Sequence, residues 1–167
     1  MINLVIICIL SALVLLTVYT DVQKYIIPNK IVIAITGLYP IAVAANWGVI
    51  DWKAGILVGI ITFIIGFGIF FLRIMGGGDV KLMAALSLWA GKVAIGDFLI
   101  LIAMYGGILS VFLILARRII ATYPAVKSGA ITPPRIFRKK QPAPYGIAIA
   151  GAFLTILFSS QVAGLSF

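Results

Sequence analysis

The chain has 167 residues, of which 63% are hydrophobic and only 10% are charged. Soluble domains are roughly half apolar and a quarter charged, so this composition excludes an ordinary water-soluble fold. A net charge of +9 would suggest nucleic-acid binding in a soluble protein, but in a membrane protein the basic residues report on sidedness. We therefore predict an all-α integral membrane protein, one polytopic domain over residues 1–167, with no nucleic-acid partner.

Uncharged stretches divide the chain into membrane-spanning candidates. Five of them are long enough to cross a hydrocarbon core of about 30 Å, and they lie at residues 1–20, 31–50, 54–72, 98–116 and 141–167. A sixth, shorter span fits residues 80–95 if Lys81 and Lys92 extend their amines toward the lipid headgroups. The expected architecture is about six transmembrane helices, one of them short.

The basic residues predict the orientation of these helices. With the N-terminus outside, eleven of the thirteen Lys and Arg residues fall on one side, which marks that side as cytoplasmic. The loops at 21–30, 73–81 and 117–145 are then cytoplasmic, and both termini lie outside. Loop 117–145 has seven basic residues and five prolines, so we expect an irregular segment that touches anionic lipid, with partner docking as the alternative.

Few groups are available for acid–base or metal chemistry. The chain has no His or Glu and a single cysteine, Cys8, which excludes an internal disulfide and a cysteine zinc cluster. We expect no metal and no organic cofactor. The predicted topology places Asp21 and Asp79 on the cytoplasmic side, where they can cooperate. Asp51 and Asp97 fall on the other side, and we expect them in solvated short loops with no catalytic role.

Each aspartate of the cytoplasmic pair also has a purely structural interpretation. Asp79 follows Gly76, Gly77 and Gly78, which permit unusual backbone angles and close approach of another chain. Alternatively, the glycines form a flexible turn and Asp79 caps the next helix. Asp21 lies near a helix C-terminus, where the macrodipole disfavours its charge, unless Lys24 compensates it.

The segment between the first two spans contains a further motif. Pro28 is expected to end the loop, and Asn29 is a candidate N-cap of the second helix. Taken with Asp21, with Gly76-Gly77-Gly78-Asp79 and Lys81, and with Pro144-Tyr145-Gly146, this sequence resembles the type IV prepilin peptidases, the GxGD aspartyl proteases of the bacterial inner membrane. Its small size, without a cysteine-rich insert, is similar to the minimal CpaA/TadV-like branch that serves Flp-type pili.

The resemblance implies an aspartic endopeptidase that removes the short basic leader of a prepilin at the cytoplasmic membrane boundary. Asp21 and Asp79 would activate water, and the other motif residues would bind substrate or support the site: Gly76, Gly77, Gly78, Lys81, Pro28 and Asn29. Helix ends favour Asp79 as the base and Asp21 as the acid. Pilin methylation and the oligomeric state stay open. The rival interpretations are an ion-coupled transporter using the same aspartates and a non-catalytic membrane scaffold.

Overall fold

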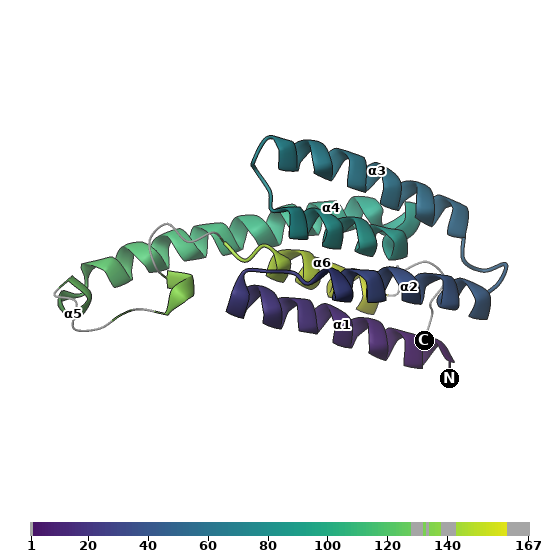
Figure 1. Cartoon of the computed structure of the whole chain (residues 1–167), viewed down its shortest axis with the longest axis horizontal. Helices are drawn as coiled ribbons and strands as arrows, with labels where there is room; N and C mark the ends of the chain where they lie inside the picture. Colours follow the sequence, from purple (N-terminus) through teal and green to yellow (C-terminus); the bar gives the residue numbers. More distant parts are fainter. Residues whose placement is uncertain (1, 128–131, 133, 138–142, 160–167) are drawn as a thin grey trace.

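The computed structural model describes residues 2–127, 132, 134–137 and 143–159, and the regular structure within them is entirely helical. The helices are listed here in chain order: α1 (Ile2–Lys24), α2 (Asn29–Ala45), α3 (Trp52–Phe71), α4 (Gly77–Thr122), the short α5 (Pro124–Lys127), the 3-10 turn η1 (Arg135–Phe137) and α6 (Gly146–Phe158). The prediction of an all-α fold is confirmed (Figure 1).

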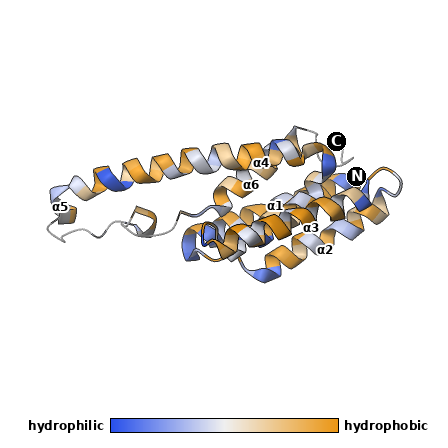
Figure 2. Cartoon of the chain, turned by 90° about the horizontal axis from the view of Figure 1, so that it is seen from above, coloured by the Kyte–Doolittle hydropathy of each residue, from blue (hydrophilic) through white to orange (hydrophobic). Residues whose placement is uncertain are grey.

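Three helices, α1, α3 and α4, are long and apolar enough to cross a membrane, and α2 and α6 are shorter apolar helices. Apolar residues predominate along the helices, as Figure 2 shows, and many of their large aliphatic and aromatic side chains are exposed. Outward-facing aliphatic and aromatic side chains suit a hydrocarbon solvent rather than water. The chain is a membrane protein, while its six spans and their orientation stay predictions.

Helix α4 consists of two segments that meet at Gly91. This residue has φ 59° and ψ −167°, values outside the helical region and open to glycine without steric cost. The chain reverses there, so that residues 77–90 and 92–122 run in opposite directions (Figure 1). The short helix predicted at 80–95 therefore exists, but it ends before Gly91 rather than at residue 95.

Aromatic contacts join the helices around the core. Helix α4 packs against α3, α6 and α2, and α1 packs against α2 and α6. The indole of the buried Trp89 donates a hydrogen bond to the Ile35 carbonyl (3.1 Å) and meets the Tyr39 ring edge to face at 5.4 Å. Phe98 and Phe153 make a similar contact between α4 and α6 at 6.0 Å. These contacts hold α2 and α6 on α4.

The irregular loop begins later than predicted. Arg117 and Arg118 belong to α4, which continues to Thr122 and ends at Tyr123, in an extended conformation immediately before Pro124. Proline disfavours a helical conformation at the preceding residue, so it sets this boundary. The Arg117 guanidinium donates to the Ile136 carbonyl at 3.1 Å, which ties η1 to the end of α4. The rest of the predicted loop lies partly outside the described residues.

Gly66 lets α3 approach the first turns of α4. A Cβ atom at this position would lie 2.8 Å from Cγ1 of Val80, the neighbour of Asp79, whereas a Cβ at Gly68 would meet nothing within 4 Å. We predict that Gly66→Ala lowers the free energy of unfolding by about 1–3 kcal/mol through overpacking. Gly68→Ala, the matched control on the same helix, should leave it unchanged or raise it slightly. Thermal unfolding in detergent measures both, and equal stability of the two variants would contradict this packing.

Candidate active site

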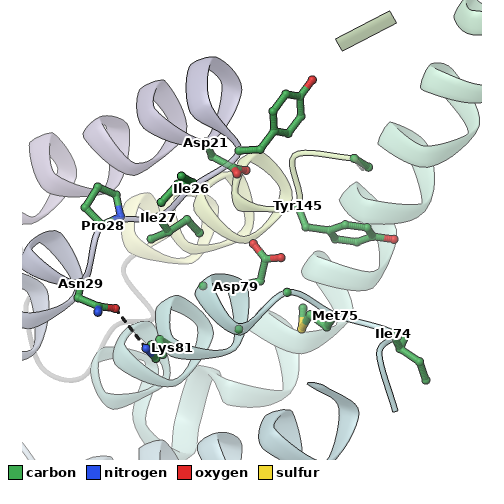
Figure 3. A pocket seen from close by; sticks show the side chains of 15 residues that line it. Asp21, Ile26, Ile27, Pro28, Asn29, Ile74, Met75, Asp79, Lys81 and Tyr145 are labelled. Carbon is green, nitrogen blue, oxygen red and sulfur yellow. Dashed lines mark hydrogen bonds between the residues drawn. The ribbon is translucent and has the colours of Figure 1, made fainter. Parts of the chain in front are cut away.

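Asp21 and Asp79 line one cavity of about 700 Å³. Asp21 lies in the last turn of α1 and Asp79 in the first turn of α4, and Figure 3 shows both carboxylates facing the same space. The structure brings all the predicted site residues to this cavity: Asp21, Pro28, Asn29, Gly76, Gly77, Gly78, Asp79 and Lys81. Segments some fifty residues apart in the sequence thus converge on two carboxylates.

Asp21 is compensated by another helix rather than by a cation. Asp21 is buried, with only 5% of its surface exposed. The sequence suggested Lys24 as its partner, but in the described part of the chain no ion pair joins the two residues. Oδ2 of Asp21 instead accepts a hydrogen bond from the backbone N–H of Gly146 at 2.9 Å. Gly146 is the first residue of α6, where backbone N–H groups have no partner within the helix and the dipole favours an anion.

Gly146 also has to be small. A Cβ atom there would lie 2.6 Å from Oδ2 of Asp21 and 3.1 Å from its Cγ. The backbone of α6 can approach the carboxylate this closely because no side chain intervenes. The first turn of α6 therefore fixes both the position and the electrostatic environment of Asp21.

Asp79 is held by the start of its own helix. Gly76 is the N-cap of α4, and its backbone donates a hydrogen bond to the Asp79 carboxylate, as an acidic residue in the first turn does in a capping box. Asp79 thus takes part in capping α4 from the first turn, although Gly76 and not Asp79 is the N-cap residue, and the same carboxylate still faces the cavity. Capping and chemistry are compatible here because the carboxylate has two oxygens.

The three glycines provide space rather than unusual backbone angles. Gly76 has φ −70° and ψ 144°, and the described glycines with positive φ are Gly48 and Gly91, so the three glycines do not use the unusual backbone angles that are open to them. A Cβ on Gly76 would lie 2.9 Å from Oδ2 of Asp79, and one on Gly78 would lie 3.3 Å from Cβ of Ile27. The glycines thus leave room for Asp79 and Ile27, and close approach of another chain stays a prediction.

Asn29 and Lys81 connect two of the sequence motifs. The Lys81 amine donates to the Asn29 side-chain oxygen at 3.2 Å (Figure 3). The prediction that Asn29 is the N-cap of α2 is wrong, because Pro28 occupies that position and Asn29 is the first helical residue. Because Asn29 lies one residue after the N-cap, its side chain does not cap α2 and instead accepts the hydrogen bond from Lys81 of α4.

Several cavity residues were not assigned from the sequence. Tyr25, Ile26, Ile27, Ile74, Met75, Ala143 and Tyr145 also line it. Tyr25 has φ 54°, which no pattern in the sequence signals, and its buried hydroxyl has no hydrogen-bond partner among the described residues. Tyr145 and Gly146 had a signal, since both belong to the motif Pro144-Tyr145-Gly146, but they received no role there.

Asp51 and Asp97 lie away from this cavity. Asp51 caps α3 through the Ala54 N–H (3.2 Å) and pairs with Lys92 at 2.8 Å, and the hydrogen bond from Lys92 holds the pKa of the Asp51 carboxyl below its usual range. Asp97 lies in α4, not in the short loop that we expected. It neighbours Ser159 just beyond the end of α6, whereas Asp21 contacts the start of that helix.

Among the described residues, no three His, Cys, Asp or Glu side chains gather to form a metal site. The two carboxylates facing the cavity are instead suited to exchanging protons with a bound water. A reaction without metal or organic cofactor stays a prediction.

Comparison with known protein families gives a match over the part of the chain that contains both aspartates. The sequence model of the type IV leader peptidase family matches residues 8–125, which include Asp21, Asp79 and the segments that connect them. No curated protein and no solved structure shows a significant match to the chain. The matched region ends before α6, so the place of Gly146 in the site rests on its hydrogen bond to Asp21 and not on this match.

We predict that Gly146→Ala lowers peptidase activity roughly 100-fold, the size of effect expected when a reacting group is misplaced by about 1 Å. The new methyl group would displace the Asp21 carboxylate and lengthen its hydrogen bond to the backbone. Gly107→Ala, where a Cβ meets nothing within 4 Å, is the control and should retain activity. Thermal unfolding of each variant separates misfolding from misplacement, and a folded, fully active Gly146→Ala protein would contradict this role.

Proposed function

Since the chain belongs to the type IV leader peptidase family, we propose that it is a membrane-embedded aspartyl endopeptidase that removes the short basic leader of type IV, Flp-like prepilins. The observation that carries the proposal is the shared cavity of Asp21 and Asp79. Two carboxylates at one site can divide the work of hydrolysis, because one can take a proton from water while the other donates a proton to the scissile carbonyl.

In the proposed reaction the two carboxylates share one proton, because two like charges in one cavity repel each other. The ionised aspartate takes a proton from water while the water oxygen attacks the scissile carbonyl carbon. The protonated aspartate donates to the carbonyl oxygen. When the tetrahedral intermediate collapses, one of its hydroxyl groups returns its proton to the ionised aspartate as the carbonyl forms again. The C–N bond breaks, and the other aspartate gives its proton to the leaving amine, so the pair again holds one proton.

The division of roles between the two aspartates cannot follow from their own helix ends alone. That argument favoured Asp79 as the base, since Asp21 lies at the C-terminus of α1. Asp21, however, accepts the Gly146 N–H at the start of α6, and Asp79 accepts a backbone hydrogen bond from Gly76. Each carboxylate thus has a helix N-terminus beside it. We therefore propose that the two aspartates act as a pair, without assigning the acid and the base to one or the other.

The location of the cavity supports a peptidase over an ion-coupled transporter. A transporter would place the carboxylates deep in the bundle, whereas Asp21 and Asp79 lie in terminal turns of their helices. The same end of the bundle includes Lys24, Lys30 and Arg73, so the positive-inside rule favours a site that faces the cytoplasm at the inner membrane. By the resemblance to the type IV prepilin peptidases, the substrate is a short basic leader followed by an apolar segment. The leader would meet the site there, while the apolar segment that follows it stays in the lipid.

We predict that Asp21→Asn and Asp79→Asn each reduce cleavage of a purified prepilin by at least about 100-fold. The asparagine amide of either variant cannot exchange the proton that the reaction needs. Asp51→Asn and Asp97→Asn are the matched controls and should retain most activity. Cleavage is followed by mass spectrometry of the released leader. Wild-type rates in folded Asp79→Asn protein would exclude the aspartyl mechanism.

The orientation is tested by cysteine labelling in a Cys8→Ser background, with an impermeant thiol reagent on intact cells. Leu72 and Trp47 are 71% and 75% exposed and lie at opposite ends of the bundle. We predict that Trp47→Cys is labelled and that Leu72→Cys is shielded until the membrane is opened. The reverse pattern would place the carboxylates on the external side, where a cytoplasmic leader cannot reach them.

A further inference from the structure

A second cavity of about 350 Å³ continues from the one that holds the two aspartates. The two share three lining residues, Ile74, Met75 and Tyr145. From there the second cavity extends between α3 and α4, lined by Thr62, Ile65, Ile69, Met83 and Leu99. We call this feature the α3–α4 groove.

The groove differs in character from the catalytic cavity. Among the residues that the structure describes, no charged side chain lines it, and its polar side chains are the hydroxyls of Thr62 and Tyr145, whereas the catalytic cavity has Asp21, Asp79 and Lys81. In Figure 3, Met75 and Tyr145 lie on one side of Asp79, and the Asn29–Lys81 pair lies on the other, together with Ile27 and Pro28. The side of Met75 and Tyr145 is the one that leads into the groove.

The groove reaches into the apolar thickness of the bundle and opens toward lipid. Thr62 lies near the middle of α3, a helix long enough to cross a membrane. Ile65 and Leu99 at its walls are 59% and 43% exposed. A chain segment could therefore enter from the side, within the bilayer, and reach the carboxylates without crossing water.

We propose that the α3–α4 groove binds the first residues of the apolar segment that follows the scissile bond of the peptide substrate. This proposal rests on the proposed function. A peptide extended from a bond held between Asp21 and Asp79 advances by about 3.3 Å per residue, and the walls that the cavity shares with the groove, Ile74, Met75 and Tyr145, are the route into it. Continuity with the catalytic cavity therefore favours substrate, rather than a second protein, as the occupant.

The walls of the groove suit a range of aliphatic side chains. Its volume is at the lower end of the range for ligand pockets, enough for a few side chains rather than a whole helix. Met75 and Met83 are unbranched and adapt their shape to different apolar partners. The groove would then select for apolar character and against charge after the cut, without reading a particular sequence.

Neighbouring isoleucines on α3 provide a matched test. Ile65 lines the groove and Ile64 does not, although the two are similarly exposed at 59% and 64%. The assay uses two synthetic peptides: a long one with leader and apolar segment, and a short one truncated two residues after the cut. Ile65→Trp should lower kcat/KM for the long peptide roughly tenfold, through KM, and leave the short peptide unaffected. Ile64→Trp should stay within about twofold for both.

Crosslinking tests occupancy without turnover. In a Cys8→Ser, Asp79→Asn background, a long peptide with a cysteine at the third residue after the cut should form a disulfide with Ile65→Cys and not with Ile64→Cys. Equal crosslinking, or equal effects of the two tryptophans on a cleaved long peptide, would overturn the groove proposal while leaving the peptidase intact. A peptide that crosslinks at position 65 but is never cleaved by the wild type would instead overturn the proposed function and support the groove.

Discussion

The hydrogen bond from Gly146 to Asp21 is the contact on which the rest of the site depends. A buried carboxylate at the C-terminal end of an apolar helix is unfavourable, because burial removes its hydration and the helix dipole opposes its charge. The N-terminus of α6 offsets part of this cost by supplying an N–H donor at 2.9 Å. That contact requires α6 to pack against α1, so the last described helix completes a site whose acidic residues come much earlier in the chain.

Asp79, by contrast, is positioned by close packing of small residues. Glycines of α3, Gly55, Gly59 and Gly66, face α4 so closely that a Cβ on any of them would press on its atoms or on the Tyr39 side chain. Small residues let apolar helices approach in a solvent that does not drive them together. The first turn of α4 is thereby held between α3 and the segment around Ile27. The spacing between the carboxylates follows from these two contacts, one polar and one steric.

The sequence predicts features that depend on local chemistry and misses those that depend on tertiary contacts. Uncharged runs identify the helices because hydrocarbon excludes charge, and the positions of the helix ends bring Asp21 and Asp79 together. The reversal at Gly91 could be foreseen only approximately, because Lys92 obscures the end of the short helix. The bonds from Lys81 to Asn29 and from Gly146 to Asp21 span 52 and 125 residues, and nothing in either local sequence indicates them.

The cavity combines two requirements that usually conflict. Hydrolysis in the proposed reaction needs water at the carboxylates, whereas a substrate with an apolar segment is most stable away from water. Placing the carboxylates in terminal turns, with Lys81 in their cavity and the α3–α4 groove continuing from it, lets each part of the substrate keep its own environment. Had both aspartates been in the middle of their helices, water would have had to enter the apolar core. The boundary between the two environments thus determines where on such a substrate the cut can fall.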